Sequence, residues 1–197
     1  SVGGADWEIW ESTERERAGQ RKGGHREKIL AIYCICSMGA LLSTYMPIRI
    51  YADTSVYGGV FDSGIDVASR EFFDQVQSGF FELVTSSVVA DELSMAPDHV
   101  RGQFELFLPV AELVPVEANS IALQQAYLKA GIVSQKWATD ALHVALATTS
   151  RCRLIVSWNF KHIVHFDKIP LYNGVNLING YDSLSINTPS EVIAYED

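Results

Sequence analysis

The stretch MPIRIYADTSVYGGVFDSG, residues 46–64, decides the fold of this chain. Ile48, Ile50 and Ala52 form a short apolar run, which is typical of a strand that enters a hydrophobic core. Asp53 ends the run and is followed by two hydroxyl residues and a Gly pair. Because a buried carboxylate is costly unless it is paired, the position of Asp53 indicates a functional role at the end of this strand.

The rest of the chain alternates strand and helix patterns. Helical spacing of apolar residues predicts helices over residues 55–61, 66–78, 87–93, 99–108, 118–130 and 138–149. Ser86 or Ser87 is expected to cap the third of these, and Asp98 the fourth. Strands are predicted over residues 48–52, 80–86, 111–116 and 153–158, and residues 174–197 predict one more strand and a short helix. Such alternation predicts an α/β fold with a parallel sheet covered on both faces.

Charge divides the chain into two regions. Residues 1–45 hold six acidic and six basic residues, whereas residues 46–197 hold 18 acidic and nine basic residues and so carry the whole net charge of −9. An acidic domain binds nucleic acid poorly on charge alone, since phosphate affinity rests on Lys and Arg. A nucleic-acid substrate would therefore require a bound divalent metal or a basic partner. We expect residues 46–197 to be the functional domain.

Residues 1–45 are expected to be an extension outside that domain. Three interpretations stay open: a dispensable or mis-assigned extension, a loosely attached appendage, or a membrane anchor. The anchor interpretation rests on residues 29–45, which are uncharged but, at 17 residues, only reach the lower limit for a spanning helix. We expect no membrane association. Three cysteines without disulfide spacing favour a reducing compartment, the cytoplasm, and Cys34-x-Cys36 lacks the second pair that a zinc site needs.

Four oxygen-bearing side chains fall at junctions between the expected elements. Asp53 follows the first strand, and Glu92 lies in the helix after the second. Asp140 opens a helix, and Asn159 follows the strand over 153–158. The carboxyl ends of parallel strands meet at one edge of the sheet, so we expect these side chains in one crevice. Carboxylates gathered in this way suit Mg²⁺ or Mn²⁺, which can activate water for phosphodiester hydrolysis.

These motifs together resemble the PIN-domain family, whose members include many metal-dependent ribonucleases and the VapC-like toxins of toxin–antitoxin pairs. The matching segments are IRIYADTS (48–55), SSVVADEL (86–93), ATDALHVALA (138–147) and VSWNFKHI (156–163). The resemblance covers about residues 46–166 and implies that Asp53, Glu92 and Asp140 are the catalytic, metal-binding residues. It also implies a PIN-like three-layer α/β/α sandwich with a mostly parallel sheet, RNA products with a 5′-phosphate and a 3′-hydroxyl, a small antitoxin partner and a homodimer.

The fourth segment departs from the family pattern, because Asn159 stands where many members carry Asp. An Asn carbonyl oxygen can bind a metal but brings no charge, which weakens a second metal more than the first. We therefore predict Asn159 to be an auxiliary metal ligand, and the number of metals stays open. Thr54 and Ser55 are predicted either to bond a metal-bound water or a substrate phosphate, or to form the turn after the strand.

Asp91 competes with Glu92 for the same position. Adjacent residues of a helix lie about 100° apart, so both cannot face the crevice equally. Val88, Val89 and Leu93 share a face that lies nearer Glu92 than Asp91. The pattern therefore predicts that Glu92 points inward.

Three histidines and one lysine lie near these motifs in the sequence. His143 lies one turn after the Asp that opens its helix, and we expect it either to be hydrogen-bonded in a structural role, the favoured interpretation, or to line the crevice. His162 and His165, three apart with no Cys nearby, are expected at the surface. Lys161 either contacts RNA phosphate or is a solvated charge.

Other classes of protein fit less well. A phosphatase with an Asp nucleophile after its first strand needs a second Asp two residues on, where this chain has Ser55. A nucleotide-binding module needs a Gly-rich phosphate loop, and Gly58-Gly59 is isolated. We predict a Mg²⁺- or Mn²⁺-dependent endoribonuclease, with the toxin of a type II toxin–antitoxin pair as its narrower form. The alternative is a catalytically weak PIN-fold module that binds nucleic acid or acts as a scaffold, which Asn159 keeps open.

Overall fold

Five short strands form one parallel sheet in the computed structural model, which describes residues 47–194. The strand order is β3-β2-β1-β4-β5, and every neighbouring pair is parallel. The strands are β1 Ile48–Ala52, β2 Phe81–Ser86, β3 Glu112–Val114, β4 Leu154–Val156 and β5 Ser185–Asn187. The strand that the opening stretch predicts therefore lies at the centre of the sheet.

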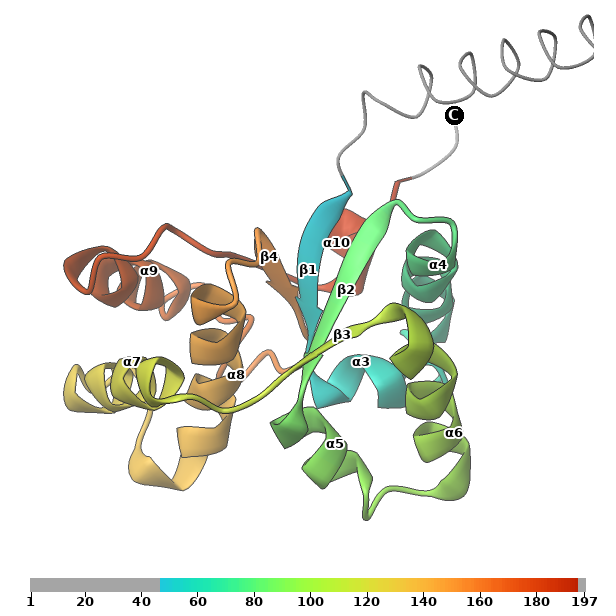
Figure 1. Cartoon of the computed structure of the whole chain (residues 1–197), viewed down its shortest axis with the longest axis horizontal. Helices are drawn as coiled ribbons and strands as arrows, with labels where there is room; N and C mark the ends of the chain where they lie inside the picture. The colour runs from blue at the N-terminus through green and yellow to red at the C-terminus, as the bar shows by residue number, and fades with distance from the viewer. Residues whose placement is uncertain (1–46, 195–197) are drawn as a thin grey trace, which may run out of the picture. The chain divides into compact units, whose positions relative to one another are not determined.

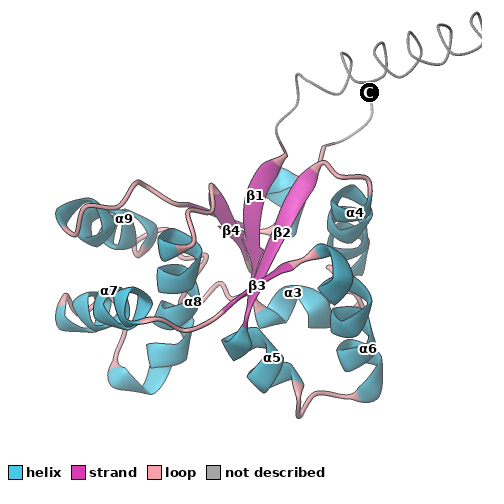
Figure 2. Ribbon diagram, viewed as in Figure 1, coloured by secondary structure: helices cyan, strands magenta, loops and turns pink. Residues whose placement is uncertain are grey.

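Helices cover both faces of this sheet, because parallel strands need long crossover connections. Figure 1 shows α7, α8 and α9 on one side of the sheet and α4 and α6 on the other, and Figure 2 shows the strands between them. The helices are α3 Thr54–Gly59, α4 Asp66–Gln77, α5 Ser87–Leu93, α6 Asp98–Phe107, α7 Ala118–Lys129, α8 Ala138–Thr149, α9 Ile169–Ile178 and α10 Pro189–Val192, with short 3₁₀ turns η1 Leu108–Val110 and η2 Gln135–Trp137. The predicted α/β architecture with a parallel, doubly covered sheet is confirmed, and it is consistent with a PIN-like fold.

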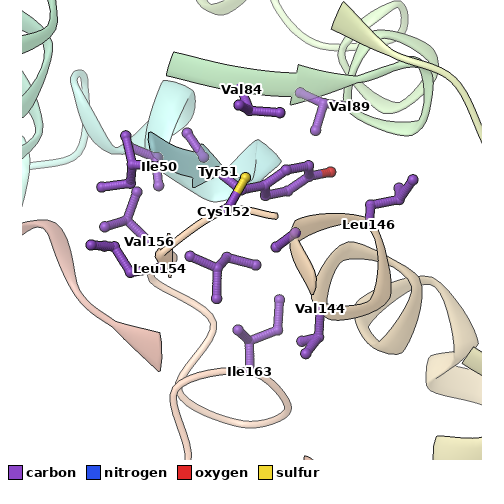
Figure 3. Close-up of a cluster of buried hydrophobic side chains, with 14 of the residues drawn as sticks. Ile50, Tyr51, Val84, Val89, Val144, Leu146, Cys152, Leu154, Val156 and Ile163 are labelled. Carbon is purple, nitrogen blue, oxygen red and sulfur yellow. The ribbon is translucent and has the colours of Figure 1, made fainter. Parts of the chain in front are cut away.

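The last three residues of the central strand are buried, as expected for a strand covered on both faces. Ile50, Tyr51 and Ala52 have no exposed surface. Figure 3 shows Ile50 and Tyr51 in a cluster that also holds side chains of β4 and α8, among them Val156 and Val144. The core thus fixes the direction of β1 and the place where its carboxyl end emerges.

The structure differs from the predicted elements in two places. Helix α9 was not predicted, because Pro170, Gly174 and Asn173 make its sequence a weak helix former. Tertiary contacts stabilise it instead, since Tyr172 is buried and donates a hydrogen bond to the backbone carbonyl of His162 (3.0 Å).

The cap of α6 is the second difference. Asp98 is the first residue of that helix and pairs with Arg101, while Pro97 stands at the cap position. The prediction of Asp98 as the cap was therefore wrong. Ser86 does cap α5, with its hydroxyl accepting a hydrogen bond from the amide of Val89 (3.3 Å).

The predictions about a membrane anchor and about the N-terminal extension concern residues that the structure does not describe. Among the helices of residues 47–194, none has the length and apolar character needed to cross a membrane. The interpretations of residues 1–45, including the uncharged segment 29–45, concern residues that the structure does not describe. The domain boundary at Met46 stays a prediction.

The Gly pair of α3 has one member that the packing requires. A Cβ on Gly59 would lie 2.6 Å from Ser69 Oγ and 2.8 Å from Trp158 Nε1, whereas a Cβ on Gly58 would meet nothing within 4 Å. The indole of Trp158 donates a hydrogen bond to Ser69 Oγ (2.9 Å), which ties the loop after β4 to α4. Gly59 therefore lets α3 approach that loop closely.

We expect Gly59→Ala to destabilise the protein by about 1–3 kcal/mol, because the added methyl overpacks the Trp158–Ser69 contact. Gly58→Ala is the matched control, and it should be neutral or stabilising by about 0.5–1 kcal/mol, as Ala is the better helix former. Urea unfolding of both variants, followed by circular dichroism, measures the difference. Equal stability of the two variants would contradict this account of the packing.

Candidate active site

Asp53 leaves the sheet at the end of β1 and caps α3. Its Oδ1 accepts hydrogen bonds from the amide (3.1 Å) and hydroxyl (2.5 Å) of Ser55, and its Oδ2 accepts one from the hydroxyl of Ser157 (2.9 Å). The residue is only 3% exposed, and this burial raises the pKa of Asp53 against the opposing effect of His143 and of the hydrogen bonds. Asp53 is therefore a rigidly held, buried carboxyl group.

Ser157 connects Asp53 to a second acidic residue, Asp140. Its hydroxyl oxygen accepts a hydrogen bond from the amide of Asn159 (2.8 Å), and the side-chain amide of Asn159 donates to Asp140 Oδ1 (2.9 Å). Burial raises the pKa of Asp140, and the charge of Glu92 raises it further. Sequence reasoning missed Ser157, although a lone hydroxyl at the end of the apolar run of β4 was a signal for it.

Glu92 reaches the same region from α5. Its Oε2 accepts hydrogen bonds from the Thr54 hydroxyl and from Nε2 of His143 (3.1 Å). Burial raises the pKa of Glu92, but the contacts of His143 and Thr54 outweigh it and hold the pKa below its usual value. Asp91 and Glu92 are both exposed, but it is Glu92 whose carboxylate contacts Thr54 and His143, so the prediction that Glu92 and not Asp91 points inward is confirmed.

A buried row of hydrogen bonds lies behind Glu92. Nδ1 of His143 lies 2.9 Å from the hydroxyl of Tyr51, which lies 2.7 Å from the hydroxyl of Ser86. One consistent assignment has Ser86 donating to Tyr51, Tyr51 to Nδ1, and the Nε2 proton of His143 to Glu92. The expected hydrogen-bonded role of His143 is confirmed, and Tyr51 and Ser86 are the members that the sequence did not indicate.

The structure gathers the predicted carboxylates around His143. The imidazole influences the pKa of Asp53, Glu92 and Asp140 alike, and Glu92 and Asp140 act on each other. These groups come from β1, α5 and α8, whose ends meet at the carboxyl edge of the sheet. The tertiary structure therefore produces an acidic site from distant parts of the sequence.

The donor atoms of this site fit a hard divalent cation. Within residues 47–194, Glu92 Oε1 and Asp140 Oδ2 have no hydrogen-bond partner, so each carboxylate keeps an oxygen for a ligand. Carboxylate oxygens are the ligands that Mg²⁺ and Mn²⁺ prefer. The same residues contain no group of three His, Cys, Asp or Glu side chains already arranged around one metal position.

Three predicted auxiliary residues have protein partners in the structure. Ser55 holds Asp53 and accepts a hydrogen bond from the amide of Trp158 (2.8 Å), and Thr54 holds Glu92. The side-chain oxygen of Asn159 accepts from the amide of His162 (3.0 Å). Contact of Thr54 and Ser55 with substrate, and of Asn159 with metal, stays a prediction.

The surface assignment of His162 was wrong. This side chain is only 6% exposed, and its ring stacks on Trp137 with ring centres 4.2 Å apart. His165 is half-buried. The i,i+3 spacing of these two histidines does not indicate whether they are buried. The packing of η2 against the loop after β4 buries His162.

Comparisons with known proteins leave the family of this chain open. No protein-family model and no curated protein matches the sequence. Among solved structures, the fold is similar to the crystal structure of VapBC2 from Rickettsia felis bound to a DNA fragment from their promoter. The TM-score is 0.43 with 17% sequence identity, over 58% of this chain and 90% of that chain. A similarity of this extent does not assign a function.

We expect metal-free Asp53→Asn to be more stable than the natural protein at neutral pH. Because the folded-state pKa of Asp53 is raised, its contribution to stability is fully present below about pH 4, the ordinary pKa of Asp, and is lost as pH rises through the folded-state value. Asn keeps the cap and brings no charge. Thermal unfolding in EDTA between about pH 4 and pH 8 should show a difference in Tm that grows with pH.

Asp91→Asn is the control for this measurement, since Asp91 is an exposed carboxylate on α5. Its Tm should follow that of the natural protein at every pH, because substitution of an exposed side chain away from the buried network changes stability little. A difference for Asp53→Asn that does not change with pH would contradict the burial of a charge at this position.

Proposed function

We propose that this domain is a Mg²⁺- or Mn²⁺-dependent endoribonuclease that hydrolyses RNA phosphodiester bonds. The observation that carries the proposal is the convergence of Asp53, Glu92 and Asp140 around the buried His143 at the carboxyl edge of the sheet. The resemblance of the four sequence motifs to the PIN-domain family also supports a metal-dependent ribonuclease. In this proposal the three carboxylates hold the metal, with Asn159 as an auxiliary ligand.

The bound metal would supply an activated water and positive charge beside the phosphate. The residues of the chain prepare the site for it. Asp53 is fixed on both oxygens by Ser55 and Ser157, which limits its freedom to reorient. His143 and Thr54 keep Glu92 ionised, as its lowered pKa indicates. Ionised carboxylates at fixed positions are what a hard cation requires.

The narrower form of the proposal is a toxin of a type II toxin–antitoxin pair. It rests on the resemblance of the motifs to VapC-like toxins, which also favours a homodimer and a small antitoxin that blocks the site. A short reading frame for a DNA-binding protein immediately upstream of the gene would support this form, and an isolated gene would count against it.

A second candidate function is a catalytically weak module that binds nucleic acid or acts as a scaffold. Two observations favour it. Asn159 directs an amide donor to Asp140, and the described residues contain no ready-made group of three metal ligands. This candidate and the nuclease differ in whether the protein binds Mn²⁺ at all.

Cleavage of RNA by the full chain with Mn²⁺ or Mg²⁺ tests the nuclease proposal. We expect EDTA to abolish the cleavage, and Asp53→Asn, Glu92→Gln and Asp140→Asn each to reduce the rate at least about 100-fold, since loss of a hydrogen-bond partner of a metal ligand alone costs about 10–100-fold. Asp91→Asn removes the neighbouring carboxylate and should cleave at the natural rate. Cleavage that survives EDTA, or that Glu92→Gln and Asp91→Asn reduce equally, would refute a metal site here.

Asn159→Asp should convert a stabilising contact into a repulsive one. Without metal we expect it to destabilise the protein by about 1–3 kcal/mol, through the lost hydrogen bond and repulsion of Asp140. Mn²⁺ should then raise its Tm more than that of the natural protein, because an added carboxylate strengthens metal binding. Thermal unfolding with EDTA and with Mn²⁺ measures both effects. If Mn²⁺ shifts neither protein, the scaffold candidate is favoured.

A further inference from the structure

Three lysines gather beside the acidic site, in a domain whose charge is otherwise strongly negative. Lys136 and Lys161 each place Nζ 5.0 Å from the ring centre of Trp137. Lys168 donates a hydrogen bond to the backbone carbonyl of Lys161 (2.9 Å) and lies 3.0 Å from Nδ1 of His162. We call Lys136, Lys161 and Lys168 the lysine cluster. It contains three of the four lysines of residues 46–197.

The packing fixes the cluster in place. Trp137 stacks on the buried His162, so its ring is a firm support for the two ammonium groups above it. His162 in turn donates its backbone amide to Asn159. Lys136 comes from η2 and Lys161 from the loop after β4, which are far apart in the sequence and meet at Trp137.

The cluster adjoins the acidic site. Trp137 and Asp140 lie within one turn of each other at the start of α8, and the charge of Lys168 acts on Asp140. Asn159, which bonds Asp140, precedes Lys161 by two residues. An anion bound by the lysine cluster would therefore lie next to whatever the carboxylates hold.

The lysine cluster also lacks direct ion pairs within the described part of the chain. Within residues 47–194, no carboxylate forms a salt bridge with Lys136, Lys161 or Lys168. By contrast, Arg49, Arg70 and Arg101 all pair with acidic residues. Like charges held close together repel one another, so the cluster is complementary to an anion with more than one phosphate group.

We propose that the lysine cluster binds backbone phosphates of the RNA strand that flank the bond at the acidic site. This inference rests on the proposed function for the identity of the strand, and it names the residues that overcome the negative charge of the domain. The cluster holds the strand electrostatically and takes no part in the hydrolysis.

The test is the binding of a short fluorescein-labelled single-stranded RNA to the full chain, followed by fluorescence anisotropy in EDTA, where the strand stays intact. We expect Lys136→Gln/Lys161→Gln to bind about 25-fold more weakly at 0.1 M salt and to reduce the slope of log affinity against log salt by about 1.4, since each phosphate contact on a single strand contributes about 0.7. The control is Arg151→Gln/Arg153→Gln, which changes the net charge equally at two exposed positions just before β4, at the opposite edge of the sheet from the cluster. It should change the slope little.

Three outcomes would overturn the inference. They are undetectable binding by the natural protein, equal weakening by the two double variants, and binding of polyglutamate as tight as that of RNA, which would indicate an acidic protein partner instead. The stabilisation by Mn²⁺ should be unchanged in Lys136→Gln/Lys161→Gln, which separates the cluster from the metal site. Lysine-dependent binding without any cleavage would refute the nuclease proposal alone, and EDTA-sensitive cleavage together with equal weakening of binding by the two double variants would refute the cluster alone.

Discussion

The carboxylate of Asp53 is the group on which the rest of the site depends. It sits at the end of the central strand, almost without exposed surface, and burial of a charge at such a position costs free energy. Hydrogen bonds from Ser55 at the start of α3 and from Ser157 after β4 compensate part of this cost and join three segments at one point. The raised pKa of Asp53 shows that the compensation is incomplete, as is common where a site is built to bind a ligand.

His143 fixes the position of the Glu92 carboxylate by a hydrogen bond. It lies between Tyr51 in the core and Glu92 at the edge, so the position of an exposed acid is set by a buried network. Asn159 plays a similar part for Asp140. Neutral or cationic donors placed between carboxylates lower their mutual repulsion, which lets the acidic site exist before any cation is bound.

The arginines and the lysines of the domain have different surroundings. Three of the five arginines of residues 47–194 form salt bridges with carboxylates, whereas Lys136 and Lys161 lie over Trp137 and form none. Under the proposed function, the acidic site would hold the metal at the phosphate that is cleaved, and the lysine cluster beside it would bind flanking phosphates. The overall charge of −9 therefore does not describe the local charge beside the acidic site.

The sequence by itself determined the features that depend on local pattern. The apolar run before Asp53, the helical spacing around Glu92 and the capping serine of α5 all follow from neighbouring residues, so the parallel α/β fold and the acidic residues at its carboxyl edge were predictable. Tertiary structure alone decided α9, the link through Ser157, the burial of His162 and the meeting of the lysine cluster at Trp137. Each of these depends on which distant segments become neighbours, and packing, not periodicity, sets that choice.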